Sequence, residues 1–131
     1  MNFTTKTIMA SIMALATVTS CDTATDEQVI DKPNLKIENG QFTPEILDGL
    51  GRVTGVQVSP DGTKVLYGIS YDNYALNKSN RELWVMDADG SNQTRLTVTA
   101  SSEQNEVWLD GGKKIAYLGK NGESMQIFVM D

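Results

Sequence analysis

The sequence contains no histidine and a single cysteine in 131 residues. A Ser/His/Asp triad, a Cys/His dyad and a histidine general base all need an imidazole, so histidine-dependent hydrolysis by this chain alone is excluded. One cysteine cannot form an internal disulfide, and a structural zinc site would have to be built almost wholly from carboxylates. We therefore expect neither a metal site nor a cofactor in this chain.

Basic residues are also scarce, because 11 lysines and arginines stand against 17 acidic residues, which gives a net charge of −6. Such a balance repels phosphates, so we expect no nucleic-acid partner. The hydrophobic share of 40% and the charged share of 21% are those of an ordinary soluble globular domain. The length favours one domain.

The longest apolar run near the N-terminus is too short to span a membrane. It covers the eleven residues 8–18, follows the single cation Lys6, and is followed at once by Thr19-Ser20-Cys21. A transmembrane helix needs about twenty apolar residues. A short cationic start, an apolar run and small residues are the anatomy of a signal peptide, which we predict over residues 1–20.

The tetrad Val18-Thr19-Ser20-Cys21 resembles the bacterial lipobox. The resemblance implies that Cys21 is acylated and becomes the N-terminus after cleavage, so we expect an exported lipoprotein that is anchored to a membrane through Cys21, in the periplasm or at the cell surface. Acyl chains supply about 0.8 kcal/mol per buried methylene, so a multiply acylated cysteine is held firmly. The alternative is an ordinary signal peptide with an incidental cysteine.

Residues 21–41 are predicted to be a flexible linker that leads into a short helix. The stretch 22–34 is polar and acidic and shows no sustained periodicity. Further on, Thr43 stands where an N-cap belongs, Pro44 suits the first helical position, and Gly49 ends the pattern. We expect a short helix over Pro44–Asp48, directly before the first strand.

From residue 53 onward the sequence predicts an all-β fold. Short runs rich in Val, Ile, Leu, Tyr and Trp alternate with Asp-Gly, Gly-Gly and Asn-Gly turn signals. The predicted strands are residues 53–58, 64–70, 82–87, 94–97, 106–109, 114–119 and 126–130.

Two segments of this β region repeat earlier ones. Residues 59–67 match 109–117 at an offset of 50, and residues 83–87 match 127–131 at an offset of 44, which places a six-residue insert within 71–80 of the first copy. Repeats of this length with about four strands each are typical of β-propeller blades. We therefore predict that residues 42–131 are the N-terminal part of a propeller domain. The competing architecture is a small β-sandwich.

The predicted blades are one complete unit over about 53–100 and one partial unit over about 101–131. The aromatic residues that recur at strand positions are expected to pack between adjacent sheets: Tyr67, Trp84, Trp108, Tyr117 and Phe128. The segment Tyr71-Asp72-Asn73-Tyr74 lies in the insert and is the one weak candidate for a binding site. Residues 87–92 resemble a calcium loop, but Val98 stands where the bidentate glutamate belongs, so we assign a hairpin loop.

The motif Ser59-Pro60-Asp61-Gly62, with Leu83-Trp84-Val85-Met86-Asp87 after it, resembles the SPDG-type propeller repeat. That repeat is found in periplasmic propellers of the Tol-Pal system and in the N-terminal propellers of serine peptidases of the prolyl oligopeptidase family. The lead-in over 42–62 and the stretch 77–84 look like the opening of exported dipeptidyl or acylaminoacyl peptidases of that family. The resemblance covers about 43–131.

Such peptidases carry an α/β-hydrolase domain with a G-x-S-x-G nucleophile elbow, an aspartate and a histidine after the propeller. None of these motifs occurs in this sequence, so no catalytic residue can be carried over. The resemblance implies the propeller fragment of a lipid-anchored peptidase whose full-length form hydrolyses peptides and which is inactive as this chain alone. Two alternatives stay open, namely a non-catalytic propeller lipoprotein that binds protein or glycan partners, and a short envelope lipoprotein.

Overall fold

The computed structural model describes residues 28–131, so the predicted signal peptide and Cys21 lie outside the described residues. The described chain is mostly β, with one short α-helix, α1 (Pro44–Asp48), and one 3-10 turn, η1 (Asp110–Gly112). Among these residues, no helix is long and apolar enough to cross a membrane. The strands are β1 (Arg52–Val58), β2 (Lys64–Asn73), β3 (Lys78–Asp87), β4 (Thr94–Arg95), β5 (Gln104–Leu109), β6 (Lys114–Asn121) and β7 (Ser124–Met130).

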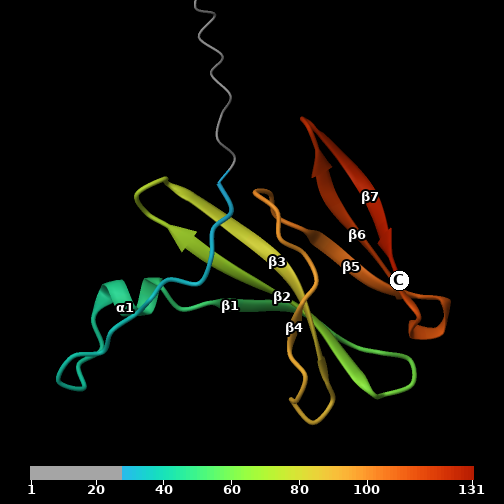
Figure 1. Ribbon diagram of the computed structural model, residues 1–131, viewed down its shortest axis with the longest axis horizontal. Helices are drawn as coiled ribbons and strands as arrows, with labels where there is room; N and C mark the ends of the chain where they lie inside the picture. Colours follow the sequence, from blue (N-terminus) through green and yellow to red (C-terminus); the bar gives the residue numbers. More distant parts are fainter. Residues whose placement is uncertain (1–27) are drawn as a thin grey trace, which may run out of the picture.

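The strands form two antiparallel sheets, in each of which neighbours in sequence are neighbours in space. The first sheet has the order β1-β2-β3-β4, and the second has the order β5-β6-β7. The second sheet stands beside the first, with β5 next to β1 and β2 and with β6 and β7 directed away (Figure 1). The expectation of an all-β chain is confirmed at this level.

The short helix α1 forms as its sequence predicts. Thr43 is extended, and its Oγ1 accepts a hydrogen bond from the Ile46 amide at 3.4 Å, while Pro44 occupies the first turn. Gly49 ends the helix, and its amide donates to the Glu45 carbonyl. Capping and a proline in the first turn favour even a single turn, and the buried side chain of Ile46 anchors it.

The insert in the first copy is a strand extension rather than a loop. We predicted strands over 64–70 and 82–87, but β2 continues to Asn73 and β3 begins at Lys78, so that Tyr71 pairs with Asn80. Asn77, with a φ of 48°, closes the turn, and its amide donates to the Tyr74 carbonyl at 3.1 Å. Backbone pairing does not need apolar side chains, so the polar composition concealed these strands.

The two sheets repeat the same local geometry, as the sequence offsets predict. The pairing of β1 with β2 is irregular between Thr54 and Gln57, and that of β5 with β6 is irregular between Gln104 and Val107. In β1, Gly55 follows Thr54 and has a positive φ of 66°. In β5, Asn105 follows Gln104 and has a positive φ of 54°. A β-bulge therefore recurs at the same place in both copies.

The core lies where the second sheet covers the first. Leu66 and Leu83 are fully buried, and in the second sheet Ile115 and Ala116 are buried. Trp108 points its Nε1 at the carbonyl of Gln57 across the junction, at 3.5 Å. In the second sheet, Tyr117 and Phe128 are cross-strand neighbours that stack on each other, with ring centroids 5.5 Å apart.

Part of the segment that we expected to be a flexible linker contacts the folded body. Ile30 is buried, and the Asp31 carboxylate lies 2.5 Å from Nη1 of Arg95 on β4. Leu35 packs at the end of α1, where a β-carbon added to Gly49 would lie 2.5 Å from its Cδ2. The first described residues of this segment therefore lie against the folded body, whereas residues 36–41 are exposed in a loop beside α1 (Figure 1).

Candidate functional site

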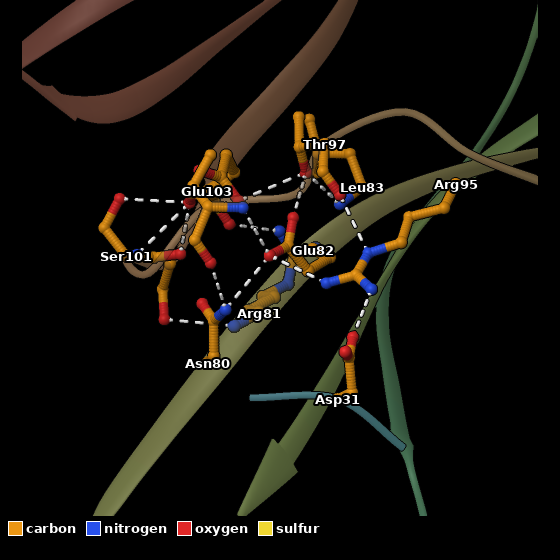
Figure 2. Close-up of polar contacts among 11 residues, drawn as sticks. Asp31, Asn80, Arg81, Glu82, Leu83, Arg95, Thr97, Ser101 and Glu103 are labelled. Atoms are coloured by element: carbon orange, nitrogen blue, oxygen red, sulfur yellow. Dashed lines mark hydrogen bonds and ion pairs between the residues drawn. The ribbon is translucent and has the colours of Figure 1, made fainter. Parts of the chain in front are cut away.

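A cluster of polar side chains lies where the two sheets meet, and we call it the inter-sheet cluster. It contains three glutamates with almost no exposure, at 2% for Glu82, 1% for Glu103 and 2% for Glu106. Burying a carboxylate is costly unless it is paired and hydrogen-bonded, so each of them needs an explanation. Its members are Thr54, Asn80, Arg81, Glu82, Arg95, Thr97, Thr99, Glu103 and Glu106, of which Figure 2 shows the part around Glu82 and Glu103.

Arg81 on β3 joins both sheets through its guanidinium. Its Nη1 and Nη2 donate to the two carboxylate oxygens of Glu106 on β5, at 2.9 and 2.6 Å. Its Nε donates to Oγ1 of Thr54 on β1, and its remaining N–H groups donate to the carbonyls of Thr54 and Glu103. All five donors therefore have acceptors, which makes this a two-point ion pair with its hydrogen bonds complete.

Two glycines make room for this ion pair. A β-carbon added to Gly68 on β2 would lie 2.0 Å from Cζ of Arg81, and one added to Gly55 on β1 would lie 2.0 Å from Oε1 of Glu106. Gly55 also has a φ of 66°, which L side chains rarely adopt. Because β1 has a bulge at Gly55 and β2 has no side chain at Gly68, the guanidinium of Arg81 can lie flat against the first sheet.

Glu82 on β3 has a separate set of partners. Its Oε1 accepts from the Asn80 side-chain amide at 3.0 Å and from the Thr99 backbone amide at 2.9 Å, and it lies 3.1 Å from Nη2 of Arg95. The Arg95 guanidinium also reaches Asp31, so it lies between two carboxylates from distant parts of the chain (Figure 2). Thr97 contributes its hydroxyl to the other Glu82 oxygen, at 2.5 Å.

Between β4 and β5, side-chain hydroxyls accept hydrogen bonds from β3 amides that the backbone of a longer β4 would accept. We predicted that this strand continues to Thr97, but β4 ends at Arg95. The Leu83 amide donates to Oγ1 of Thr97 at 2.9 Å, and the Arg81 amide donates to Oγ of Ser102 at 3.1 Å. At this edge of β3, hydroxyls therefore accept from the amides of Leu83 and Arg81, while the carbonyls of these residues accept from the backbone amides of Leu96 and Glu103, which brings Glu103 into the cluster.

The inter-sheet cluster is built for support rather than for turnover. Its acids are enclosed and engaged by arginine, amide and hydroxyl groups. A hollow of about 310 Å³ lies beside the ion pair and is lined by Thr54, Gly55, Gln57, Arg81, Gln104, Asn105 and Glu106, but the carboxylate of Glu106 is already engaged by Arg81. Within residues 28–131, no three His, Cys, Asp or Glu side chains are grouped so that they could hold a metal ion. Burial raises the pKa of the Glu103 carboxyl above its ordinary value, although hydrogen bonds from Thr99 and Thr97 oppose the rise.

The segment Tyr71-Asp72-Asn73-Tyr74, which the sequence marks as a binding candidate, lies at the far end of the β2–β3 hairpin. Its first three residues are partly buried in the strand, whereas Tyr74 is 67% exposed at the turn. A hollow of about 270 Å³ is found there, lined by Asp72, Asn73, Tyr74, Asn77, Lys78 and Ser79. Asp72 is paired with Arg52. This hollow is polar and open, and it contains no nucleophile–base pair.

Sequence reasoning missed the buried glutamates. Glu82 and Glu106 stand at the first positions of the strands that we predicted, where a charged residue is ordinarily solvated. Their burial depends on partners up to 25 residues away in sequence, as for Arg81 and Glu106. The one usable signal was the density of hydroxyl residues between 97 and 102, which is high beside two glutamates. Cys21, the predicted lipidation site, lies outside the described residues.

No protein-family model matches the chain. The chain is similar to the protein named dipeptidyl-peptidase 5 of Porphyromonas gingivalis, with 38% identity over 86 residues, which are 66% of this chain and 13% of that protein. It is also similar to the protein of that name from Porphyromonas endodontalis, with 32% identity over 90 residues, which are 69% of this chain and 13% of that protein. The chain is therefore related to dipeptidyl peptidases and spans about an eighth of the length of these relatives.

Proposed function

We propose that this chain is the first part of a β-propeller domain in an exported, lipid-anchored serine peptidase of the prolyl oligopeptidase family. The full-length form would remove dipeptides from peptide substrates, and the propeller would screen those substrates before they reach the hydrolase domain. The observation that carries this proposal is the 38% identity over 86 residues with a protein named dipeptidyl-peptidase 5. The chain itself, without histidine, contributes structure rather than catalysis.

The architecture supports the propeller part of this proposal. The two sheets repeat one antiparallel pattern and pack side by side, which is how blades are arranged. Both outer faces are apolar and exposed, with exposed fractions of 60% at Val56 on β1 and 73% at Ile127 on β7. In a longer propeller, each such face is covered by the next sheet. Further sheets would therefore bury the apolar residues that these two sheets leave exposed.

The decisive experiment is to sequence the genomic DNA for several hundred codons beyond codon 131, in frame and in neighbouring frames, and then to express the extended product. We expect a hydrolase domain with a G-x-S-x-G elbow, an aspartate and a histidine, and release of chromophore from a dipeptidyl substrate by the extended product. The 131-residue chain is the matched control and should show no turnover. Further repeats without a hydrolase domain would favour the non-catalytic binding propeller, and an authentic stop codon would favour the short lipoprotein.

Lipid anchoring is tested separately. Cells that express the chain are fed labelled palmitate, and the wild type is compared with Cys21→Ser. We expect label on the wild type and its recovery in the membrane fraction, whereas C21S should lose both because acylation needs the thiol. Equal recovery of label on both proteins would contradict the anchor and leave the peptidase proposal standing.

A further inference from the structure

The hydroxyl of Thr97 lies between two buried carboxylates. Its Oγ1 is 2.5 Å from Oε2 of Glu82 and 3.2 Å from Oε2 of Glu103, and it already accepts the Leu83 amide. A hydroxyl has one hydrogen to donate and two lone pairs, and an ionised carboxylate offers acceptors only. If both glutamates were ionised, one of these two contacts would join two oxygens without a hydrogen between them.

The second oxygen of Glu103 meets the same shortage. Oε1 of Glu103 is 2.7 Å from Oγ1 of Thr99, and that hydroxyl also faces the Ser101 carbonyl at 2.8 Å. A carbonyl is an acceptor, so the single Thr99 hydrogen again has two acceptors in reach. One additional proton on the Glu103 carboxyl removes one of these two shortages, because a carboxylic acid has a single hydrogen and can donate it to one of the two hydroxyls.

The proton belongs on Glu103 rather than on Glu82. Glu82 already has a cationic partner, because it lies 3.1 Å from the Arg95 guanidinium, and it accepts hydrogen bonds from a side-chain amide and a backbone amide. Among the ion pairs within residues 28–131, none includes the Glu103 carboxylate. Burial and a neighbouring carboxyl, without a cation in contact, both raise the pKa of the Glu103 carboxyl and favour its protonated form.

The other charged groups around Glu103 do not alter this assignment. Arg81 on β3 donates to the Glu103 backbone carbonyl, but its charge is matched by Glu106 on β5. Arg95 on β4 is shared by Glu82 and by Asp31 of the N-terminal segment. From β6, Tyr117 faces the pair. Burial raises the pKa of its hydroxyl, and the charges of Glu103 and Glu82 raise it further.

We propose that Glu103 is protonated at neutral pH and shares its proton with Glu82 through the Thr97 hydroxyl, which makes the joint between the two sheets pH-sensitive. The Glu103 amide donates to the Arg81 carbonyl at 2.9 Å, so the same residue fixes the connecting segment to the edge of β3 (Figure 2). When Glu103 releases its proton to water, two like charges face each other across one hydroxyl. Residues 97–103 are then held less firmly at the edge of β3, and the second sheet depends more on the Arg81–Glu106 pair for its attachment.

The direction of the pH effect is fixed by linkage. Burial raises the pKa of folded Glu103 above the ordinary value of 4.5, so between these two values the folded chain binds a proton that the unfolded chain does not bind. The free energy of unfolding therefore decreases as the pH rises through this interval and is constant above it. The chain has no histidine, so no side chain with an unperturbed pKa changes its charge between about pH 5.5 and pH 7.5.

Two measurements on the full chain test this inference. Carbon-detected NMR titration of the glutamate carboxyls should give Glu103 a midpoint well above those of the exposed glutamates. In urea unfolding, the urea concentration at the midpoint should decrease for the wild type as the pH is raised from about 5 to about 7.5. Glu103→Gln should have the same midpoint at both pH values, because its amide donates where the acid proton did. At the upper pH, this midpoint should be higher than that of the wild type.

Glu106→Gln is the matched control, because it makes the same chemical change at an equally buried glutamate whose partner is Arg81. E106Q should lower the midpoint at both pH values and keep the pH dependence of the wild type. An ordinary titration midpoint for Glu103, or an E103Q variant that is destabilised at every pH with the pH dependence retained, would overturn the proposal. The titration is done on the wild type, so it decides the matter even if E103Q does not fold.

Discussion

The first and second sheets have the same strand pattern and different degrees of enclosure. Lys64 pairs with Asp87 in the first sheet at 2.7 Å, and Lys114 pairs with Asp131 at the corresponding position of the second at 2.8 Å. Yet Leu83 on β3 is fully buried, whereas its counterpart Ile127 on β7 is 73% exposed. The alternation of residues creates the strand in both cases, but a neighbouring sheet is needed to turn an apolar face into a core.

The two sheets also differ in how their edges are fastened. The first carries a fourth strand and receives both the N-terminal segment, through Asp31, and the connection to the second sheet, through Glu103. The second ends its order at β7, which is paired on one side. An arginine–glutamate pair joins the sheets, so the second sheet depends on the first for both enclosure and attachment.

The largest effect is expected from removing the arginine that joins the sheets. Arg81→Ala leaves the Glu106 carboxylate buried and unpaired, and breaking a buried pair in this way costs about 3–5 kcal/mol. Urea unfolding should show this decrease in the free energy of unfolding. Arg52→Ala is the control, since its ion pair with Asp72 has a 57% exposed arginine and should contribute little. Equal losses in the two variants would show that Arg81 is not the main link.

The next effect contrasts equivalent apolar positions of the two sheets. Leu83→Ala should lower the free energy of unfolding by about 2–5 kcal/mol, because it creates a cavity at a fully buried position. Ile127→Ala should change it by about 0.5 kcal/mol or less, because Ile127 is exposed. Both values come from urea unfolding. A large loss for I127A would indicate that the outer face of β7 is covered in solution, for example by a second copy of the chain.

A smaller, pH-dependent effect on stability is expected at the turn before β2 and not at the corresponding turn before β6. Asp61 accepts hydrogen bonds from the Ser59 hydroxyl at 2.6 Å and from the Thr63 amide at 3.1 Å, which lower its pKa from 3.8 to about 2. Its contribution to stability is present above about pH 4 and is lost as the pH falls towards 2. Asp61→Asn should remove this part of the acid dependence in urea unfolding at pH 2–5.

Asp110 begins the corresponding turn of the second sheet, which is the short helix η1 with no side-chain cap. Asp110→Asn is therefore the matched control for D61N, and its unfolding should keep the acid dependence of the wild type. If D110N removed as much of that dependence as D61N, the Ser59-Pro60-Asp61-Gly62 turn would have no special role.

The smallest effect is expected at the paired lysines. Lys64 and Lys114 are 52% and 45% exposed, and solvent and salt screen both ion pairs. Lys64→Ala and Lys114→Ala should therefore shift the urea midpoint by no more than the error of the measurement, and equally in both sheets. A clear difference between the two variants would show that the two sheets share a backbone arrangement but that their equivalent ion pairs do not contribute equally to stability.

The sequence predicted the elements that depend on local pattern. The helix over Pro44–Asp48 has the predicted bounds, because its cap, its proline and its terminating glycine are neighbours in sequence. The repeat offsets predicted two related units, whereas the matching bulges at Gly55 and Asn105 were found only in the structure. The strand ends at Asn73 and Lys78 were missed, since backbone pairing between polar residues leaves no hydrophobic signal.

The sequence by itself therefore determined an acidic, all-β chain of two related hairpin units, because alternation and turn residues act over a few positions. The tertiary structure alone decided which apolar face is core and which charged residues are buried. Apart from the hydroxyl residues between 97 and 102, the local sequence around Glu82, Glu103 and Glu106 does not distinguish them from solvated acids. They are enclosed because Arg81, Arg95 and the hydroxyls of residues 97–102 approach them from other strands and connections, and a buried charge depends on partners that only folding brings within hydrogen-bond distance.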